Sequence, residues 1–266
     1  MPTLCQTFRK EAGMVWNHMR KAASLGLSLS EQTLTESALY NIAVAHQDTD
    51  IVIDLATKAA ESKHGADWEW WLVRGKKGLG LGFRVQAKRL FGNGRYSSLT
   101  KPGQNPYEQL DKLVSTSTGA GFEPLYCFFN FPFPDGQFNG PNLCKHRYRA
   151  PTFWGCSLAF PDQVKNMQST QLTKLRPIIY PWHLLVCESV NLDLIGAATH
   201  FVTVRGQRDH AISPRELPIR VRRLIELGDR RRTADDRRYL DDAYWGSEGA
   251  PDEDIAGLVV FRDLRD

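Results

Sequence analysis

The sequence predicts an α/β protein in which a mixed central sheet lies between layers of helices. Over residues 30–132 the apolar residues follow helical and strand periodicities in the order helix, strand, strand, strand, helix, strand. This αβββαβ order is typical of a layered α/β core. A content of 42% hydrophobic and 24% charged residues is that of a globular protein. The chain contains no run of about 18 apolar residues, so no membrane span is expected.

Two helices precede the first strand. An amphipathic helix is predicted over residues 3–23, and a second helix over residues 31–46. Ser30 is a favourable N-cap for the second helix, and Glu31 falls in its first turn. Glu36 lies near the edge of the apolar stripe of this helix.

The predicted strands are short and bounded by turn residues. β-branched residues indicate a strand over residues 51–56, and two further strands are predicted over residues 65–71 and 83–90. The glycines and lysines of residues 72–82 indicate a hairpin connection between the last two. A helix is expected to start at Pro106, followed by an apolar strand over residues 124–131. Residues 132–149 are expected to form a long loop, and residues 154–160 another strand.

The last hundred residues are less regular. Strands are predicted over residues 178–188 and 198–204, and helices over residues 214–227 and 235–244. The predicted organisation is an N-terminal helix (1–29), an α/β core (30–160) and an α+β C-terminal extension packed on the core (161–266). The five cysteines are widely scattered, which suits a reduced, cytoplasmic protein.

Polar side chains recur on the two strands of the predicted hairpin. Alternate strand residues share a face, so Asp67 and Glu69 project together, and so do Gln86 and Lys88. If the strands pair, carboxylate, amide oxygen and ammonium converge on one patch of the sheet. Such a patch is suited to holding a divalent metal and polarising a phosphate.

The element order and the Asp67 and Gln86-Ala87-Lys88 positions resemble the PD-(D/E)XK nuclease superfamily over residues 30–132. Some branches of that superfamily, including Mrr-like restriction enzymes, have Gln-x-Lys in place of acid-x-Lys. Residues 65–70, 86–90 and 124–130 further resemble the uncharacterised bacterial family DUF6615. The superfamily resemblance implies a restriction-endonuclease-like fold and metal-dependent cleavage of phosphodiester bonds.

The resemblance also implies roles for individual residues. Asp67, the Gln86 side chain, the Ala87 carbonyl and Glu36 would hold Mg²⁺, or Mn²⁺. Lys88 would hold or deprotonate the attacking water and stabilise the transition state. Because Gln86 brings no negative charge, Glu69 or Glu61 is an alternative source of the missing carboxylate.

Basic residues near this patch suggest contacts with nucleic acid. The candidates are Lys76, Lys77, Arg84 and Arg89. The arginine-rich residues 220–238 either follow a phosphate backbone or pair with neighbouring acids. A net charge of +4 is compatible with a polyanionic partner. The resemblance implies DNA as the expected substrate, a bacterial defence or restriction setting, and a homodimer or a defence-system partner protein.

Less specific interpretations compete with each of these. Asp67, Glu69, Gln86 and Lys88 would also suit the solvent face of amphipathic strands, and the chain would then be a nuclease-fold module that binds nucleic acid or protein without cleaving it. The tryptophans at 68, 70 and 71 are expected in the core. Zinc is not expected at Cys127, Cys144, His146 and Cys156, because no pair has the close spacing of structural zinc sites.

Overall fold

The two N-terminal helices form where the sequence predicts them. α1 (Leu4–Ser24) begins at a capping box in which Thr3 and Gln6 exchange hydrogen bonds. α2 (Glu31–Ala45) begins after Ser30, whose hydroxyl accepts a hydrogen bond from the Thr33 N–H at 3.0 Å. This computed structural model describes residues 2–57, 66–75, 78–100, 103, 105–132, 144, 150–187, 192–207, 212–233, 244 and 257–265.

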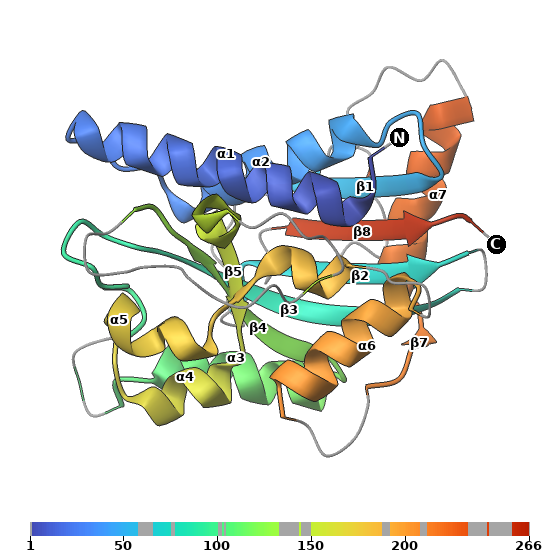
Figure 1. The fold of residues 1–266 in the computed structure, drawn as a ribbon. Helices are drawn as coiled ribbons and strands as arrows, with labels where there is room; N and C mark the ends of the chain where they lie inside the picture. Colours follow the sequence, from blue (N-terminus) through green and yellow to red (C-terminus); the bar gives the residue numbers. More distant parts are fainter. Residues whose placement is uncertain are drawn as a thin grey trace.

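A mixed eight-stranded sheet forms the centre of the fold (Figure 1). Its order across the sheet is β1 (Ile51–Thr57), β8 (Gly257–Asp263), β2 (Trp68–Arg74), β3 (Leu79–Arg89), β4 (Glu123–Phe129), β5 (Cys156–Ala159) and β6 (Tyr180–Pro181). β7 (Arg215–Glu216) pairs with the start of β3. β8 runs antiparallel to β1 and parallel to β2, and β3 runs antiparallel to β2 and parallel to β4. The observed mixed sheet confirms the α/β prediction.

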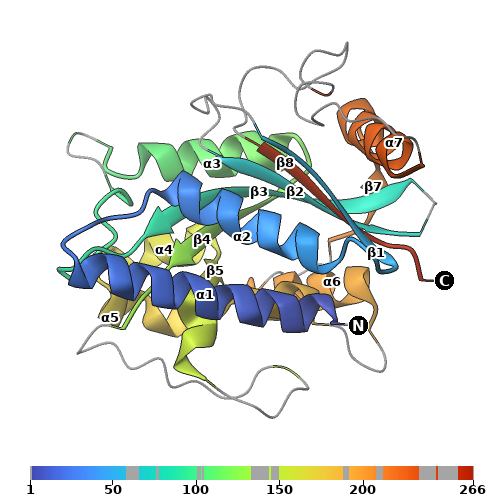
Figure 2. The same ribbon diagram turned by 90° about the horizontal axis from the view of Figure 1, so that it is seen from above.

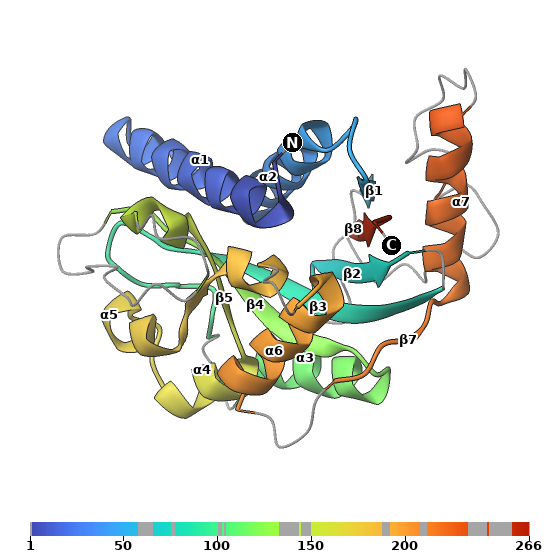
Figure 3. The same cartoon turned by 45° about the vertical axis from the view of Figure 1, so that its right-hand side comes forward.

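Helices cover both faces of the sheet. They are α3 (Glu108–Gly119), α4 (Pro161–Met167), α5 (Leu172–Leu175), α6 (Leu194–Arg205) and α7 (Ile219–Thr233), together with the 3₁₀ turns η1 (Pro151–Gly155), η2 (Arg176–Ile178) and η3 (Trp182–Val186). Figure 2 shows α1, α2 and α6 on one side of the sheet and α3 and α7 on the other. Figure 3 shows α7 beside β8 and β2 at one end, with α4 and α5 at the opposite end.

Apolar side chains from both faces of the sheet form the core. Trp68 and Trp70 are buried under α1 and α6, whereas Trp71 is buried on the opposite face with α7. The predicted packing role of these tryptophans is therefore confirmed. The α3 connection joins the neighbouring parallel strands β3 and β4, as a crossover helix does in α/β folds. It thereby places α3 directly over the C-terminal half of β3.

Several predicted elements differ from those observed. β3 begins at Leu79, inside the predicted turn, and the turn keeps positive φ at Gly75 (59°) and Gly78 (67°). The predicted strand 198–204 is wrong, because these residues belong to α6, whose N-cap Asp193 accepts a hydrogen bond from the Gly196 N–H. Residues 182–186 form η3 instead of strand. Helix 235–244 and the loop 132–149 lie almost wholly outside the described residues.

The C-terminal strand β8 was not predicted at all, although it lies between β1 and β2 in the sheet. Residues 161–266 therefore supply a central strand of the core, in addition to elements that pack on it. The predicted boundary at residue 160 does not separate two sheets. Within the described part of the chain, no helix has both the length and the apolar character needed to cross a membrane.

Candidate metal and phosphate site

The candidate site forms where β3 continues past the start of β2. β2 begins at Trp68, opposite Val85, so beyond that point one edge of β3 pairs with no strand among the described residues. Two carboxylates occupy this open edge. Asp67 Oδ2 accepts a hydrogen bond from the Ala87 N–H at 2.8 Å, and Glu31 Oε1 accepts one from the Arg89 N–H at 2.9 Å. The two N–H groups are roughly 6.6 Å apart along the strand, so the two acids lie side by side.

Gln86 and Lys88 share the face of β3 that lies under α3. Val85 and Ala87 pack into the core on the opposite face, as strand alternation requires. Lys88 is buried, and its Nζ donates a hydrogen bond to Gln109 Oε1 of α3 at 3.2 Å. Extending the β2–β3 register by one residue places Asp67 opposite Gln86. Asp67, Gln86 and Lys88 therefore all lie at this end of the hairpin, and their joint role as a site stays a prediction.

Burial shapes the electrostatics of Asp67. The pKa of this carboxyl is raised to about 6, chiefly by desolvation, and the negative charge of Glu31 acts in the same direction. The Ala87 N–H and the Lys88 ammonium oppose this shift, because both stabilise the ionised form. A divalent cation would favour the ionised carboxylate in the same way. Asp67 is therefore a carboxylate that gains from a positively charged ligand.

The donor set suits a hard divalent cation. Gln86 Oε1 is buried and accepts no hydrogen bond from the described residues, which leaves its oxygen available as a ligand. The Ala87 carbonyl points to the same strand edge as its N–H, toward Asp67. Carboxylate, amide and backbone oxygens are the ligands that Mg²⁺ and Mn²⁺ accept in proteins. Asp67, Gln86, Ala87 and Glu31 would together hold such an ion.

The helix acid at this site is Glu31 rather than the predicted Glu36. Besides the Arg89 N–H, Glu31 accepts a hydrogen bond from Ser98 Oγ at 3.2 Å. Glu36 instead accepts one from Gln32 Nε2 within α2. Acidic residues are common in the first turn of a helix, where they complement the helix dipole. The position of Glu31 in the sequence therefore gives no indication of a role in the site. Only the direction in which α2 meets β3 distinguishes the two acids.

Glu69 and Arg84 belong to an internal ion cluster. The Glu69 carboxylate is fully buried and lies 2.9 Å from Arg220 Nη2 and 3.4 Å from Arg84 Nε. Arg84 also donates to the Thr116 carbonyl at 2.8 Å and packs over the Phe122 ring. Glu69 is thus paired with two arginines instead of joining Asp67. Arg84 lies in the interior and is not presented to nucleic acid.

The other residues predicted to contact nucleic acid or to supply a carboxylate differ in their surroundings. The Arg89 guanidinium lies 4.1 Å from the centroid of the Phe91 ring and is half-buried near the site. In the arginine-rich segment, Arg220 pairs with Glu69 and Arg232 pairs with Asp54, which supports the internal-pairing interpretation for these two. Lys76, Lys77 and Glu61 lie outside the described residues, so their predicted roles stay predictions.

Comparison with known protein families identifies the chain. The model of DUF6615, a family of unknown function, matches residues 4–262, from the first turn of α1 to the end of β8. The chain belongs to the DUF6615 family. No curated protein matches it. The match includes Asp67, Gln86 and Lys88 and all but the last residue of the C-terminal strand β8.

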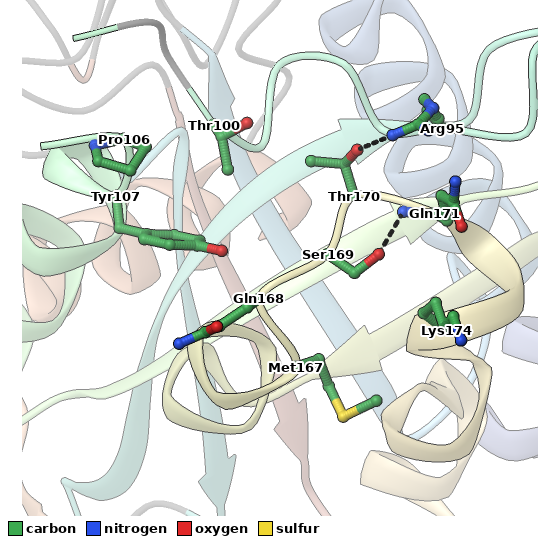
Figure 4. A pocket seen from close by; sticks show the side chains of 10 residues that line it. All are labelled: Arg95, Thr100, Pro106, Tyr107, Met167, Gln168, Ser169, Thr170, Gln171 and Lys174. Carbon is green, nitrogen blue, oxygen red and sulfur yellow. Dashed lines mark hydrogen bonds between the residues drawn. The ribbon is translucent and has the colours of Figure 1, made fainter.

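A cavity of about 650 Å³ lies between the loop after β3, the segment before α3 and the α4–α5 region of this DUF6615 protein (Figure 4). Tyr107, Arg95 and Lys174 are among its lining residues. Arg95 donates a hydrogen bond to Thr170 Oγ1 at 3.4 Å. None of Asp67, Gln86, Lys88 and Glu31 lines this cavity, although Ser98, which donates a hydrogen bond to Glu31, lies on the same loop as Arg95.

The cysteines divide into two groups. Cys127 and Cys156 are buried in the core between strands, as predicted for structural thiols. Cys144, in contrast, lies close to Cys5 and Cys187. His146 lies outside the described residues. This grouping could not be anticipated from spacing, because the three cysteines are far apart in the sequence.

Proposed function

We propose that this DUF6615 protein is a metal-dependent nuclease that hydrolyses phosphodiester bonds. The observation that carries the proposal is the grouping of Asp67, Gln86 and Lys88 at the open end of β3, with Glu31 beside them. The αβββαβ order of α2 to β4 and the resemblance to the PD-(D/E)XK superfamily support the same assignment. The catalytic set proposed is therefore Asp67, Glu31, Gln86 and Lys88.

The chemistry required of these residues is simple. Water attacks phosphorus and forms a new P–O bond, the bond from phosphorus to the leaving oxygen breaks, the attacking water loses a proton, and the leaving oxygen gains one. A bound divalent cation would neutralise phosphate charge and make a bound water more acidic. Lys88, held by Gln109, would orient the water and donate a hydrogen bond to a phosphate oxygen. Asp67 and Glu31 would supply carboxylate oxygens to hold the ion.

DNA is the proposed substrate, and bacterial defence or restriction is the proposed setting; both come from the superfamily resemblance. The cavity between the loop after β3 and the α4–α5 region supports a polyanionic ligand, since Arg95 and Lys174 are among its lining residues. The proposed partners are accordingly nucleic acid and a second copy or a defence-system protein.

A cleavage assay tests the proposal. The purified chain is incubated with circular DNA, linear DNA and RNA, each with Mg²⁺, Mn²⁺ or EDTA. We expect metal-dependent cleavage of DNA that Asp67→Ala and Lys88→Ala each reduce by at least about 100-fold, with circular dichroism unchanged. Lys112→Ala is the matched control, because Lys112 is exposed on α3. Full activity in either site variant would refute the assignment.

A non-catalytic binding module is the second candidate. One observation favours it: Gln86 stands where the commoner pattern of the superfamily has an acid, which lowers the negative charge available to hold a cation. A Mn²⁺ titration separates the two functions. Binding that is lost in Asp67→Asn supports the nuclease, whereas nucleic-acid affinity that is the same with and without metal supports the module.

A further inference from the structure

Three cysteine thiols meet on the α1 side of the molecule, apart from the candidate nuclease site. The sulfur atoms of Cys5, Cys144 and Cys187 all lie within 4.8 Å of one another. Cys5 is in the first turn of α1, Cys144 follows β4 in the chain, and Cys187 immediately follows η3. The cluster therefore joins three segments that are distant in sequence.

Two of the three segments are held rigidly against each other. The Trp182 indole N–H of η3 donates a hydrogen bond to the Phe8 carbonyl of α1 at 2.6 Å. The Phe8 and Trp182 rings also pack with their centroids 4.6 Å apart. Cys5 lies one turn before Phe8 in α1, and Cys187 directly follows η3. The packing of α1 on η3 therefore brings the two cysteines close together. Pre-positioned ligands of this kind favour metal binding.

The grouping of three thiols favours the binding of a metal cation. Cys5 is buried, and its hydrogen bonds with the Cys144 and Cys187 thiols favour the protonated form and, together with burial, raise the pKa of its thiol. Three adjacent thiolates would repel one another without a positive ion. Because a metal ion replaces the thiol protons on binding, it removes this cost. Sulfur ligands select soft or borderline-soft ions over Mg²⁺.

We propose that Cys5, Cys144 and Cys187 form a structural zinc site. Zn²⁺ binds thiolates at about 2.3 Å, and tetrahedral coordination then places sulfur atoms roughly 3.8 Å apart. The observed cluster, within 4.8 Å, needs only a small contraction to reach this geometry. Water or a fourth side chain completes the shell. The ion fastens the start of α1 to η3 and to the chain segment after β4.

Metal analysis of the full chain tests the site. The protein is purified under reducing conditions from zinc-supplemented cells, and its metal content is measured by mass spectrometry. We expect one zinc per chain, and reconstitution with Co²⁺ should give a thiolate-to-cobalt charge-transfer band. Cys144→Ala and Cys187→Ala, both at half-buried positions, should lose both signals. Cys156→Ala, at a buried thiol in β5, is the matched control and should keep them.

Thermal melting adds a readout of the structural role. Chelation should lower the melting temperature of the wild-type chain and of Cys156→Ala, but not that of Cys144→Ala. Zinc retained by both cluster variants, no zinc in the wild type, or a disulfide between two of the three cysteines in the purified chain would each overturn the proposal. The Asp67→Asn variant should retain zinc, so a failure of the nuclease assignment leaves this test unaffected.

Discussion

At the scale of single residues, Asp67 sets the pH dependence of the candidate site. Its pKa is raised to about 6 in the folded chain, from an ordinary value of 3.8, chiefly because of desolvation. Between these values the folded chain holds a proton that the unfolded chain has released. The free energy of unfolding without metal should therefore fall as the pH rises from about 4 to about 6, and stay lower above that range.

Removing the Asp67 charge tests this linkage. In EDTA at pH 7.5, Asp67→Asn should increase the free energy of unfolding by roughly 1–3 kcal/mol, because the variant no longer buries an ionised carboxylate. Urea unfolding between pH 4 and pH 8 provides the measurement. The wild type and the variant should converge near pH 4. Parallel curves over the whole range would contradict the raised pKa.

Metal binding should show the opposite pH trend, because a cation requires the ionised Asp67. With a pKa of about 6, the ionised fraction at pH 5 is roughly a tenth. Mn²⁺ affinity should therefore fall about tenfold between pH 7.5 and pH 5, as measured by calorimetry. Asp67→Asn should bind weakly at both values. Equal wild-type affinity at the two values would exclude Asp67 as a ligand.

The two acids of α2 form a matched pair for mutagenesis. Glu31 binds the Arg89 N–H at the end of β3, whereas Glu36 contacts Gln32 on its own helix. Glu31→Gln should lower metal-dependent cleavage by roughly 10- to 1000-fold. Glu36→Gln should change it little if Glu31 is the helix ligand. Loss of activity in Glu36→Gln alone would restore the sequence-based prediction for that residue.

At the scale of elements, the Glu69 cluster joins α7 to the sheet. Glu69 on β2 binds Arg84 on β3 and Arg220 on α7. Removing one member of a buried ion pair leaves the other charges without a counterion. Glu69→Gln should lower the free energy of unfolding by about 3 kcal/mol, as measured in urea. Glu216→Gln, at an exposed position on β7, should change it by less than about 0.5 kcal/mol.

At the scale of the whole molecule, β8 joins β1 to the rest of the sheet. It pairs with β1 over seven residues and with β2 over seven residues, so β1 has no neighbouring strand in the described sheet without it. A chain truncated after residue 256 should lose cooperative unfolding and aggregate, because β1 and β2 would both expose open edges. Size-exclusion chromatography and thermal melting provide the test. A folded, monomeric truncation product would contradict this role of β8.

The sequence predicts best those features of the fold that depend on residues close together in the chain. Ser30 caps α2 as expected, and strand alternation on β3 places Gln86 and Lys88 on one face, because capping and pleating involve only neighbouring residues. The sequence predicts a strand within α6, because an apolar residue, Val204, also lies on its exposed face and obscures the helical stripe. β8 was missed because its hydrophobic run is isolated at the end of an acidic segment.

The sequence by itself determined the α/β class, the positions of α1 to β4 and the Asp67, Gln86 and Lys88 set. These features depend on periodicity and on spacing within one hairpin. The tertiary structure decided which other groups join them. It brings Glu31 instead of Glu36 to the end of β3, pairs Glu69 with arginines, and gathers three distant cysteines. Such contacts depend on how elements pack across the sheet, and residues far apart in sequence carry no local signal of that packing.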